Sequence, residues 1–208
     1  MINWYEYENQ AHSEGYKVVC GVDEAGRGPL AGPVCAACVI MPENSKLEGV
    51  INDSKKLSEK KREELYDLIC DEAIAYSISM VDEKVIDEIN ILQATFKAMK
   101  NAIDNISVKP DIALIDGNRM PPELSVEGRT VIKGDAKSIS IAAASILAKV
   151  TRDRFLYQLD KEYPEYQFAK HKGYGTKLHY EMLEKYGISP VHRRSFLKKL
   201  SDLPDLKR

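Results

Sequence analysis

The sequence lacks any long apolar run, and this absence argues against a membrane-embedded protein. No stretch of its 208 residues reaches the ~18 consecutive apolar residues that a membrane-spanning helix needs. Residues 1–8 are polar and acidic, unlike the start of a secretory or transit peptide. The chain also lacks internal repeats and low-complexity linkers. We therefore expect a soluble, cytoplasmic protein with a buried core.

Cysteine is scarce, with four residues in the chain, which fits a reducing compartment where thiols stay free. Cys35 and Cys38 form a C-x-x-C pair, a spacing that also occurs in redox motifs and zinc sites. The pair lies inside the apolar run 34–41, which is typical of a buried strand. Because residues three apart on a strand point to opposite faces, we expect both thiols to pack in the core instead of sharing a metal or a bond.

The net charge is also small, at −2, but the charges are unevenly distributed. Residues 169–200 carry eight lysines and arginines against two glutamates, together with three of the four histidines. Such a run is usually a solvated face, yet beside an acidic body it can also orient a polyanion. The histidines, His171, His179 and His192, match no common zinc motif, and we interpret them as ordinary residues of this basic face.

Apolar periodicity predicts strands and helices mixed along the chain. Strands are expected at 17–22, 34–41, 76–81, 111–115 and 130–133. Helices are expected at 58–69, 90–106, 138–159 and 176–186, the first two capped by Ser58 and Asn90. The small residues 142–145 would let the third helix approach the sheet closely. These elements predict an α/β domain with a mixed central sheet flanked by helices, and a basic helical C-terminal appendage at about 164–208.

Acidic residues follow three of the expected strands. Asp23 and Glu24 close the first strand, and Asp116 and Asp135 follow 111–115 and 130–133. Ligands bind at strand ends of α/β sheets, and carboxylates gathered there usually hold a cation. An all-oxygen set favours Mg²⁺ or Mn²⁺ over zinc. Each acid alone could instead cap a helix or form a turn.

A glycine-rich segment, residues 26–33, follows the first pair of acids. It does not match an ATPase phosphate loop, because no Gly-Lys-Ser/Thr ends it and prolines follow. It does not match a dinucleotide fingerprint either, because the third glycine comes one position late and the chain enters a strand. What remains is a sharp turn whose bare backbone amides can approach a sugar or phosphate.

Seven motifs, in order, resemble those of type 2 ribonucleases H, the bacterial ribonuclease HII family. They are GVDEAGRGPLAGP at 21–33, NDSKKL at 52–57, LIDGN at 114–118, KGD at 133–135, AASILAKVTRD at 143–153, HKGYGT at 171–176 and SPVHRRSF at 189–196. The first motif is long and highly specific, and the resemblance covers almost the whole chain.

The resemblance implies a ribonuclease H-like fold and a four-carboxylate site, carried over onto Asp23, Glu24, Asp116 and Asp135. Asp153 also lies in a family motif and is the alternative for the fourth position, although its place deep in a helix favours a structural role. Two Mg²⁺ or Mn²⁺ ions held by such carboxylates can activate water and stabilise the leaving 3′-oxygen.

The resemblance also implies substrate contacts, at Gly26, Arg27, Gly28, Lys55, Lys172 and Tyr174. The glycine turn would read the 2′-hydroxyl that distinguishes RNA from DNA. Tyr174 would stack on the deoxyribose next to the ribonucleotide; otherwise it is a loop aromatic that packs on the domain. The two lysines, and likewise Arg193 and Arg194, are candidates for phosphate contacts, with a solvated side chain as the alternative.

The implied activity is endonucleolytic hydrolysis of RNA in RNA/DNA hybrids, on the 5′ side of a ribonucleotide. The family prefers RNA–DNA junctions, including a single ribonucleotide in duplex DNA, and leaves a 3′-hydroxyl and a 5′-phosphate. It is similar to enzymes that start the removal of misincorporated ribonucleotides. A nucleic-acid binding module without catalysis is the alternative. A type 3 relative is disfavoured because residues 1–16 are too few for its extra N-terminal domain. We expect a monomer, because no helix carries a sustained apolar heptad.

Overall fold

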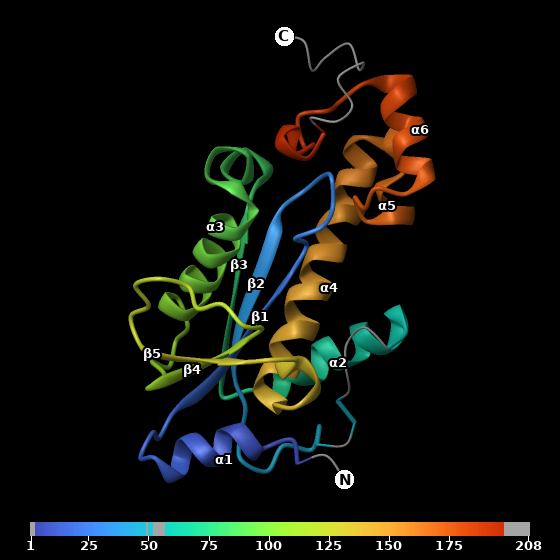
Figure 1. The fold of residues 1–208 in the computed structure, drawn as a ribbon. Coiled ribbons are helices and arrows are strands. Elements are labelled where there is room, and N and C mark those ends of the chain that lie inside the picture. Colours follow the sequence, from blue (N-terminus) through green and yellow to red (C-terminus); the bar gives the residue numbers. More distant parts are fainter. Residues whose placement is uncertain (1–2, 49, 52–56, 198–208) are drawn as a thin grey trace.

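The structure, a computed structural model, describes residues 3–48, 50–51 and 57–197 and is built on one five-stranded sheet (Figure 1). The strands are β1 (Val19–Ala25), β2 (Val34–Ile40), β3 (Ala75–Val81), β4 (Ile112–Asp116) and β5 (Glu127–Val131). Their order across the sheet is β3-β2-β1-β4-β5. The first three pair antiparallel, whereas β4 is parallel to both β1 and β5. The mixed α/β sheet is confirmed.

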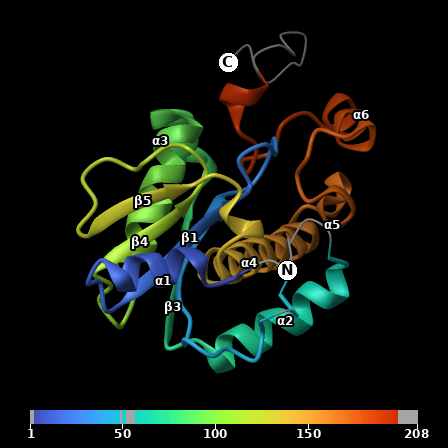
Figure 2. The same cartoon turned by 60° about the horizontal axis from the view of Figure 1, so that its bottom comes forward.

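Helices cover both faces of the sheet (Figures 1 and 2). On one face, α4 (Ile139–Glu162) packs on β1 and β2, and α2 (Glu59–Glu72) packs on α4, so that both helices contribute to one apolar cluster. On the other face, α3 (Glu83–Asp104) packs mainly on β2 and β3 and also reaches β1. None of the helices in the described ranges is long and apolar enough to cross a membrane.

Cys35 and Cys38 follow the strand period of β2. Cys35 packs in the cluster under α4 and α2, whereas Cys38 packs in the cluster under α3. Both thiols are free and fully buried. The expectation that they pack in the core on opposite faces of a strand is confirmed.

The backbone of α4 touches β1. A Cβ atom on Gly21 would lie 2.2 Å from the amide nitrogen of Ile141, so only glycine fits there. The small residues 142–145 are all buried at this contact. The predicted close approach of this helix to the sheet is confirmed, and it fixes the end of β1 relative to α4.

Side-chain caps start the helices where the sequence indicates. The hydroxyls of Ser58, Ser138 and Thr176 accept the amide N–H three residues later, at 3.2, 3.2 and 3.3 Å. Asn90 also caps a helix, because its Oδ1 accepts the amides of Leu92 and Gln93 at 3.0 and 3.2 Å. It does so inside α3, with φ 67° and ψ 164°, so that α3 consists of two helical halves joined at Asn90.

Three features differ from the sequence expectation. The first half of α3, capped by Asp82, was not predicted. β5 spans Glu127–Val131 and not 130–133, because pairing with β4 outweighs the weak strand propensity of Gly128. The helix α1 (Glu6–Ser13) was also not predicted. It docks on the start of α4 through Glu8, whose Oε1 accepts the Ser138 hydroxyl at 2.6 Å, a long-range contact that no local pattern reveals.

The described part of the basic C-terminal segment packs on the end of α4. It contains η3 (Pro164–Tyr166), α5 (Phe168–His171), α6 (Lys177–Tyr186) and η4 (Arg194–Phe196). Its apolar residues form a separate cluster with Leu30, Ala31 and Leu156. This contact places the segment beside the glycine-rich loop that joins β1 to β2. The remainder of the predicted appendage, 198–208, lies outside the described residues.

Candidate active site

Two acid-bearing strands end at the same edge of the sheet. β1 and β4 are parallel neighbours in which Val22 pairs with Ile115, so the next residues, Asp23 and Asp116, lie side by side at the carboxyl end of β4. Asp23 does not follow its strand as predicted, because β1 continues to Ala25 and Asp23 still pairs with Ala37 of β2. Asp23 points toward α4 and hydrogen-bonds to Ser145 there. The Oδ1 atom of Asp116 accepts the amide of Gly134 at 2.6 Å.

Burial and like charge act together on these acids. Burial raises the pKa of Asp23 well above its usual range, and the charges of Glu24 and Asp116 raise it further. Burial also raises the pKa of Glu24, whereas the guanidinium of Arg27, 3.4 Å from its Oε1, lowers it. The three carboxyl groups of Asp23, Glu24 and Asp116 are therefore more stable when one of them is protonated or a cation is bound nearby than when all three are charged.

The three acids line one open cleft of about 490 Å³. The glycine turn of residues 26–28 and the ring of Tyr174 line the same cleft. Sequence reasoning missed three further lining residues, Arg62, Ser145 and Lys149. Ser145 and Lys149 are one helical turn apart on α4, and that spacing was the available signal.

Asp135 and Asp153 do not line the cleft. Asp135 is buried in η2 (Gly134–Ala136), directly after the glycine that binds Asp116. The carboxylate of Asp153 accepts from the ammonium of Lys149 at 2.7 Å. Asp135 is thus adjacent to the cleft through Gly134, and its assignment as the fourth carboxylate stays a prediction.

The cleft fits a hard divalent ion in the kind of donors it offers. Among the described residues, three carboxylates are its potential ligands, and neither cysteine nor histidine lines it. Within the described part of the chain, no three carboxylate, imidazole or thiol side chains are close enough to enclose an ion. The carboxylates are therefore gathered at one edge without forming a closed cage.

Two buried arginines hold the glycine-rich loop between β1 and β2 through hydrogen bonds to its backbone carbonyls. Arg193 donates to the carbonyls of four loop residues at 2.7 to 3.1 Å, and these are Gly26, Arg27, Pro29 and Gly32. Arg152 donates to the carbonyls of Ala31, Pro33 and Lys172 at 3.0 to 3.1 Å. Both guanidiniums are fully buried, and burial lowers the pKa of each.

This arrangement corrects the interpretation of Arg193 as a phosphate contact. Its side chain has no exposed surface and is saturated by carbonyls, so it positions the turn and cannot reach substrate. With the carbonyls bound inside, the amides of Arg27 and Gly28 make no hydrogen bond to any described residue. They are available to a ligand in the cleft.

Tyr174 lies against the turn. Its Cε1 atom would be 3.7 Å from a Cβ atom on Gly28, and 42% of the residue is exposed. Lys149 Nζ and Arg152 Cζ each lie 5.9 Å from the ring centre. The structure thus places an accessible aromatic ring beside the turn and two cations.

Two of the other predicted phosphate contacts, Lys172 and Arg194, lie outside the cleft lining. The ammonium of Lys172 donates to the Ala169 carbonyl at 2.6 Å and lies 3.9 Å from the ring centre of Tyr157. Arg194 is exposed at the start of η4, beside a different hollow. Lys55 lies outside the described residues.

The interpretation of the three histidines as basic-face residues is wrong. His171, His179 and His192 are 7%, 0% and 2% exposed, and they pack around Phe168. Burial lowers the pKa of all three, to about 4 for His179 and about 3 for His192. The sequence could not reveal this, because basic neighbours on both sides made the stretch look solvated.

Two of these imidazoles fix the backbone that carries Tyr174. The Nδ1 atom of His171 accepts the Gly173 amide at 3.2 Å, and His179 Nδ1 lies 2.9 Å from the Tyr174 carbonyl. The Gly173 carbonyl in turn accepts the Leu30 amide at 2.8 Å. The tyrosine loop and the glycine turn are therefore one connected unit.

Comparison with known proteins matches most of the chain to one family. The sequence model of the family described as Ribonuclease HII matches residues 20–199. The ribonuclease HII of Caldicellulosiruptor bescii is 59% identical over 201 residues, covering 97% of this chain and 97% of that protein. The ribonuclease HII of Acetivibrio thermocellus is 59% identical over 192 residues, covering 92% of this chain and 74% of that protein.

Solved structures agree. Ribonuclease H2 from Pyrococcus horikoshii OT3 has a TM-score of 0.75 at 29% identity, covering 92% of this chain and 100% of that chain. A PCNA:RNase HII complex from Archaeoglobus fulgidus has a TM-score of 0.74 at 28% identity, covering 85% of this chain and 94% of that chain. Bst-RNase HIII in complex with Mn²⁺ shares the fold, with a TM-score of 0.64 at 17% identity, covering 85% of this chain and 65% of that chain.

Proposed function

The chain belongs to the ribonuclease HII family, and from that premise we propose that it cuts duplexes on the 5′ side of a ribonucleotide at an RNA–DNA junction. As a member of this family it is a metal-dependent ribonuclease H, an endonuclease that acts on RNA/DNA hybrids. The proposed substrates include a single ribonucleotide embedded in duplex DNA. The proposed products carry a 3′-hydroxyl and a 5′-phosphate.

One observation carries the proposal. Three carboxylates, a turn with two amides that bond to none of the described residues, and an exposed tyrosine line the same cleft. A metal-dependent hydrolase needs only the carboxylates. The turn and the ring beside them add the means to recognise a sugar next to the scissile phosphate.

We propose that Asp23, Glu24 and Asp116, together with Asp135, hold Mg²⁺ or Mn²⁺. When bound, two such ions would supply an activated water and stabilise the leaving oxygen. The carboxylate charges, which oppose one another in the cleft, give the ions their binding energy. The Mn²⁺ complex of Bst-RNase HIII supports this choice of ion.

The chain's own residues supply the recognition. The amides of Arg27 and Gly28 are positioned for hydrogen bonds to the ribonucleotide, whose 2′-hydroxyl both donates and accepts. The ring of Tyr174 packs against the neighbouring deoxyribose, a position where a 2′-hydroxyl would intrude. Recognition of the junction follows from these two contacts acting on adjacent sugars.

The proposed function also has cellular consequences. Nicking at single ribonucleotides would start their removal from DNA. A nuclease of this kind works where the chromosome is, which for this chain predicts the cytoplasm. We propose that it acts as a monomer, since the sequence carries no sustained apolar heptad of the kind that forms a coiled-coil dimer.

The test is incubation of DNA duplex containing one ribonucleotide with wild type, Asp116→Asn and Asp71→Asn proteins, each with Mg²⁺, Mn²⁺ or a chelator. Asp71 is exposed on α2 and serves as the matched control. We expect metal-dependent nicking 5′ of the ribonucleotide by wild type and Asp71→Asn, and none by Asp116→Asn. Duplex binding without nicking by any protein would favour the binding module over the nuclease.

A further inference from the structure

A second hollow of about 320 Å³ adjoins the acid cleft, and we call it the α3 hollow. It shares Glu24, Arg27 and Asp116 with the cleft, so the Arg27–Glu24 ion pair forms the boundary between the two. The cleft continues toward α4 and Tyr174, whereas the α3 hollow continues toward α3. A nucleic-acid strand whose scissile phosphate lies at Glu24 and Asp116 can therefore continue into the cleft in one direction and into the α3 hollow in the other.

The wall of the α3 hollow is apolar. Leu92, Phe96 and Met99 line it from the second half of α3, on one helical face. The break at Asn90 sets the direction of this half, and Leu92 and Phe96 remain partly exposed. Such a wall suits the flat face of a sugar or a base.

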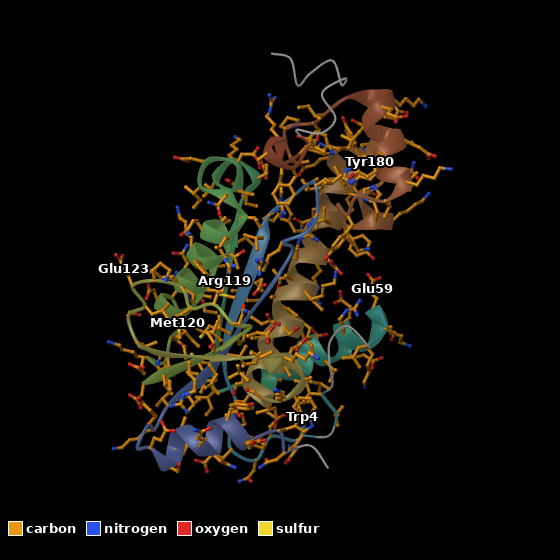
Figure 3. All side chains as sticks on the ribbon, viewed as in Figure 1. Trp4, Glu59, Arg119, Met120, Glu123 and Tyr180 are labelled. Atoms are coloured by element: carbon orange, nitrogen blue, oxygen red, sulfur yellow. The ribbon has the colours of Figure 1, made fainter. Side chains whose placement is uncertain are left out.

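The opposite side of the α3 hollow carries positive charge. Figure 3 labels Arg119 on the loop that follows β4, beside α3. Arg119 is exposed, lines the hollow, and has no ion-pair partner among the described residues. Arg27 stands at the boundary with its side chain 51% exposed. Two guanidiniums beside an apolar wall match a nucleotide, which combines a phosphate with a flat, less polar body.

We propose that the α3 hollow binds the deoxynucleotide on the 5′ side of the scissile phosphate, with Arg119 on a phosphate of the cut strand and Phe96 against its sugar or base. This inference rests on the proposed function, because that function assigns the Tyr174 side to the 3′ neighbour. The α3 hollow, on the other side of the acids, then holds the 5′ neighbour, which is the nucleotide that keeps the new 3′-hydroxyl.

The test couples Arg119 to individual phosphates. Duplexes containing one ribonucleotide are made with a single neutral methylphosphonate at each position of the cut strand in turn. Their Kd values for wild type and Arg119→Gln are measured by fluorescence anisotropy in a chelator, so that no cleavage occurs. We expect Arg119→Gln to weaken binding of the unmodified duplex about 10-fold. This loss should shrink to less than about 2-fold when the phosphate that Arg119 contacts, 5′ of the cut, is neutral.

Lys109→Gln is the matched control. Lys109 is an exposed cation just before β4, at the opposite end of that strand from Asp116. The affinity lost in Lys109→Gln should be small, and it should not depend on which phosphate is neutral. An equal effect of Arg119→Gln on every duplex overturns the proposal, and so does coupling to phosphates 3′ of the cut or on the complementary strand. If wild type binds without nicking in Mg²⁺, the proposed function fails while the Kd values still decide where Arg119 binds.

Discussion

The Nε2 atom of His179 lies 3.0 Å from the Nε2 atom of His192, so one imidazole donates and the other accepts. His179 Nδ1 faces the carbonyl of Tyr174 at 2.9 Å, and a carbonyl only accepts. His179 therefore carries its proton on Nδ1 and accepts from His192. His192 Nδ1 in turn accepts the Ser189 amide at 3.0 Å. These bonds assign a neutral tautomer to both rings, and they tie the Tyr174 loop to the segment after α6.

The histidine pair predicts acid sensitivity. Burial lowers the pKa of His179 to about 4 and of His192 to about 3, whereas an unfolded histidine titrates near 6.5. As the pH falls below about 6.5, the unfolded chain takes up protons that the folded chain does not. The free energy of unfolding should therefore fall toward pH 4, by up to about 1.4 kcal/mol per pH unit for each histidine.

Urea unfolding across this pH range measures the effect. His192→Gln should flatten the pH dependence, because the variant removes one of the two groups with a lowered pKa. His12→Gln is the control, since His12 lies on α1 away from the cluster. An unchanged slope in His192→Gln would contradict the assignment.

Replacing Arg193 by lysine should loosen the glycine turn while keeping the charge. A lysine has one nitrogen and cannot reach four carbonyls as the guanidinium does. Buried carbonyls would lose their partners, so we expect a loss of about 2–4 kcal/mol in the free energy of unfolding. Nicking should fall about 10-fold or more, because a turn displaced by 1 Å misplaces the substrate.

Arg194→Lys is the matched control for this change. Arg194 is exposed. Its backbone amide donates a hydrogen bond to Asp87 Oδ2 at 2.8 Å, so the contact does not depend on its side chain. Urea unfolding and a nicking assay on both variants separate the two positions. Equal behaviour of Arg193→Lys and Arg194→Lys would mean that the carbonyl bonds contribute little.

Much of the fold follows from local sequence signals. The alternation around Cys35 and Cys38, and the caps at Ser58 and Asn90, act within a few residues, and the structure confirms them. Position along the chain also predicted that Asp116 closes a strand and that Asp23 lies near the end of one, although β1 extends to Ala25. These features depend on neighbours in sequence and are therefore readable from it.

The features that escaped prediction depend on long-range contacts. Arg193 binds carbonyls more than 160 residues away in sequence, so its burial has no local signature. The histidines look solvated in a basic stretch, yet Phe168 and Tyr166 enclose them once the segment folds. A motif identifies such residues without distinguishing those that touch substrate from those that support it.

The two glycines of the turn should respond differently to alanine. At Gly26, φ is +97° and a Cβ would lie 2.2 Å from Arg152 Nε, so Gly26→Ala should cost about 2–4 kcal/mol of stability. At Gly28 the nearest atom is Tyr174 Cε1 at 3.7 Å, an ordinary contact. Gly28→Ala should stay within about 1 kcal/mol of wild type in thermal or urea unfolding. It should nevertheless reduce nicking, since the methyl group enters the cleft. Equal stability of the two variants would contradict the clash at Gly26.

Removing the ring of Tyr174 should separate the two classes of substrate. In Tyr174→Ala, cutting at a lone ribonucleotide in DNA should fall about 10-fold, the size of one lost stacking contact. Cutting within a long RNA/DNA hybrid should fall less, because no deoxyribose follows the cut ribonucleotide there. Tyr174→Phe keeps the ring beside Gly28 and should retain the wild-type preference. Steady-state nicking on both substrates gives the ratio, and equal losses on the two would show that Tyr174 supports the loop without sensing the junction.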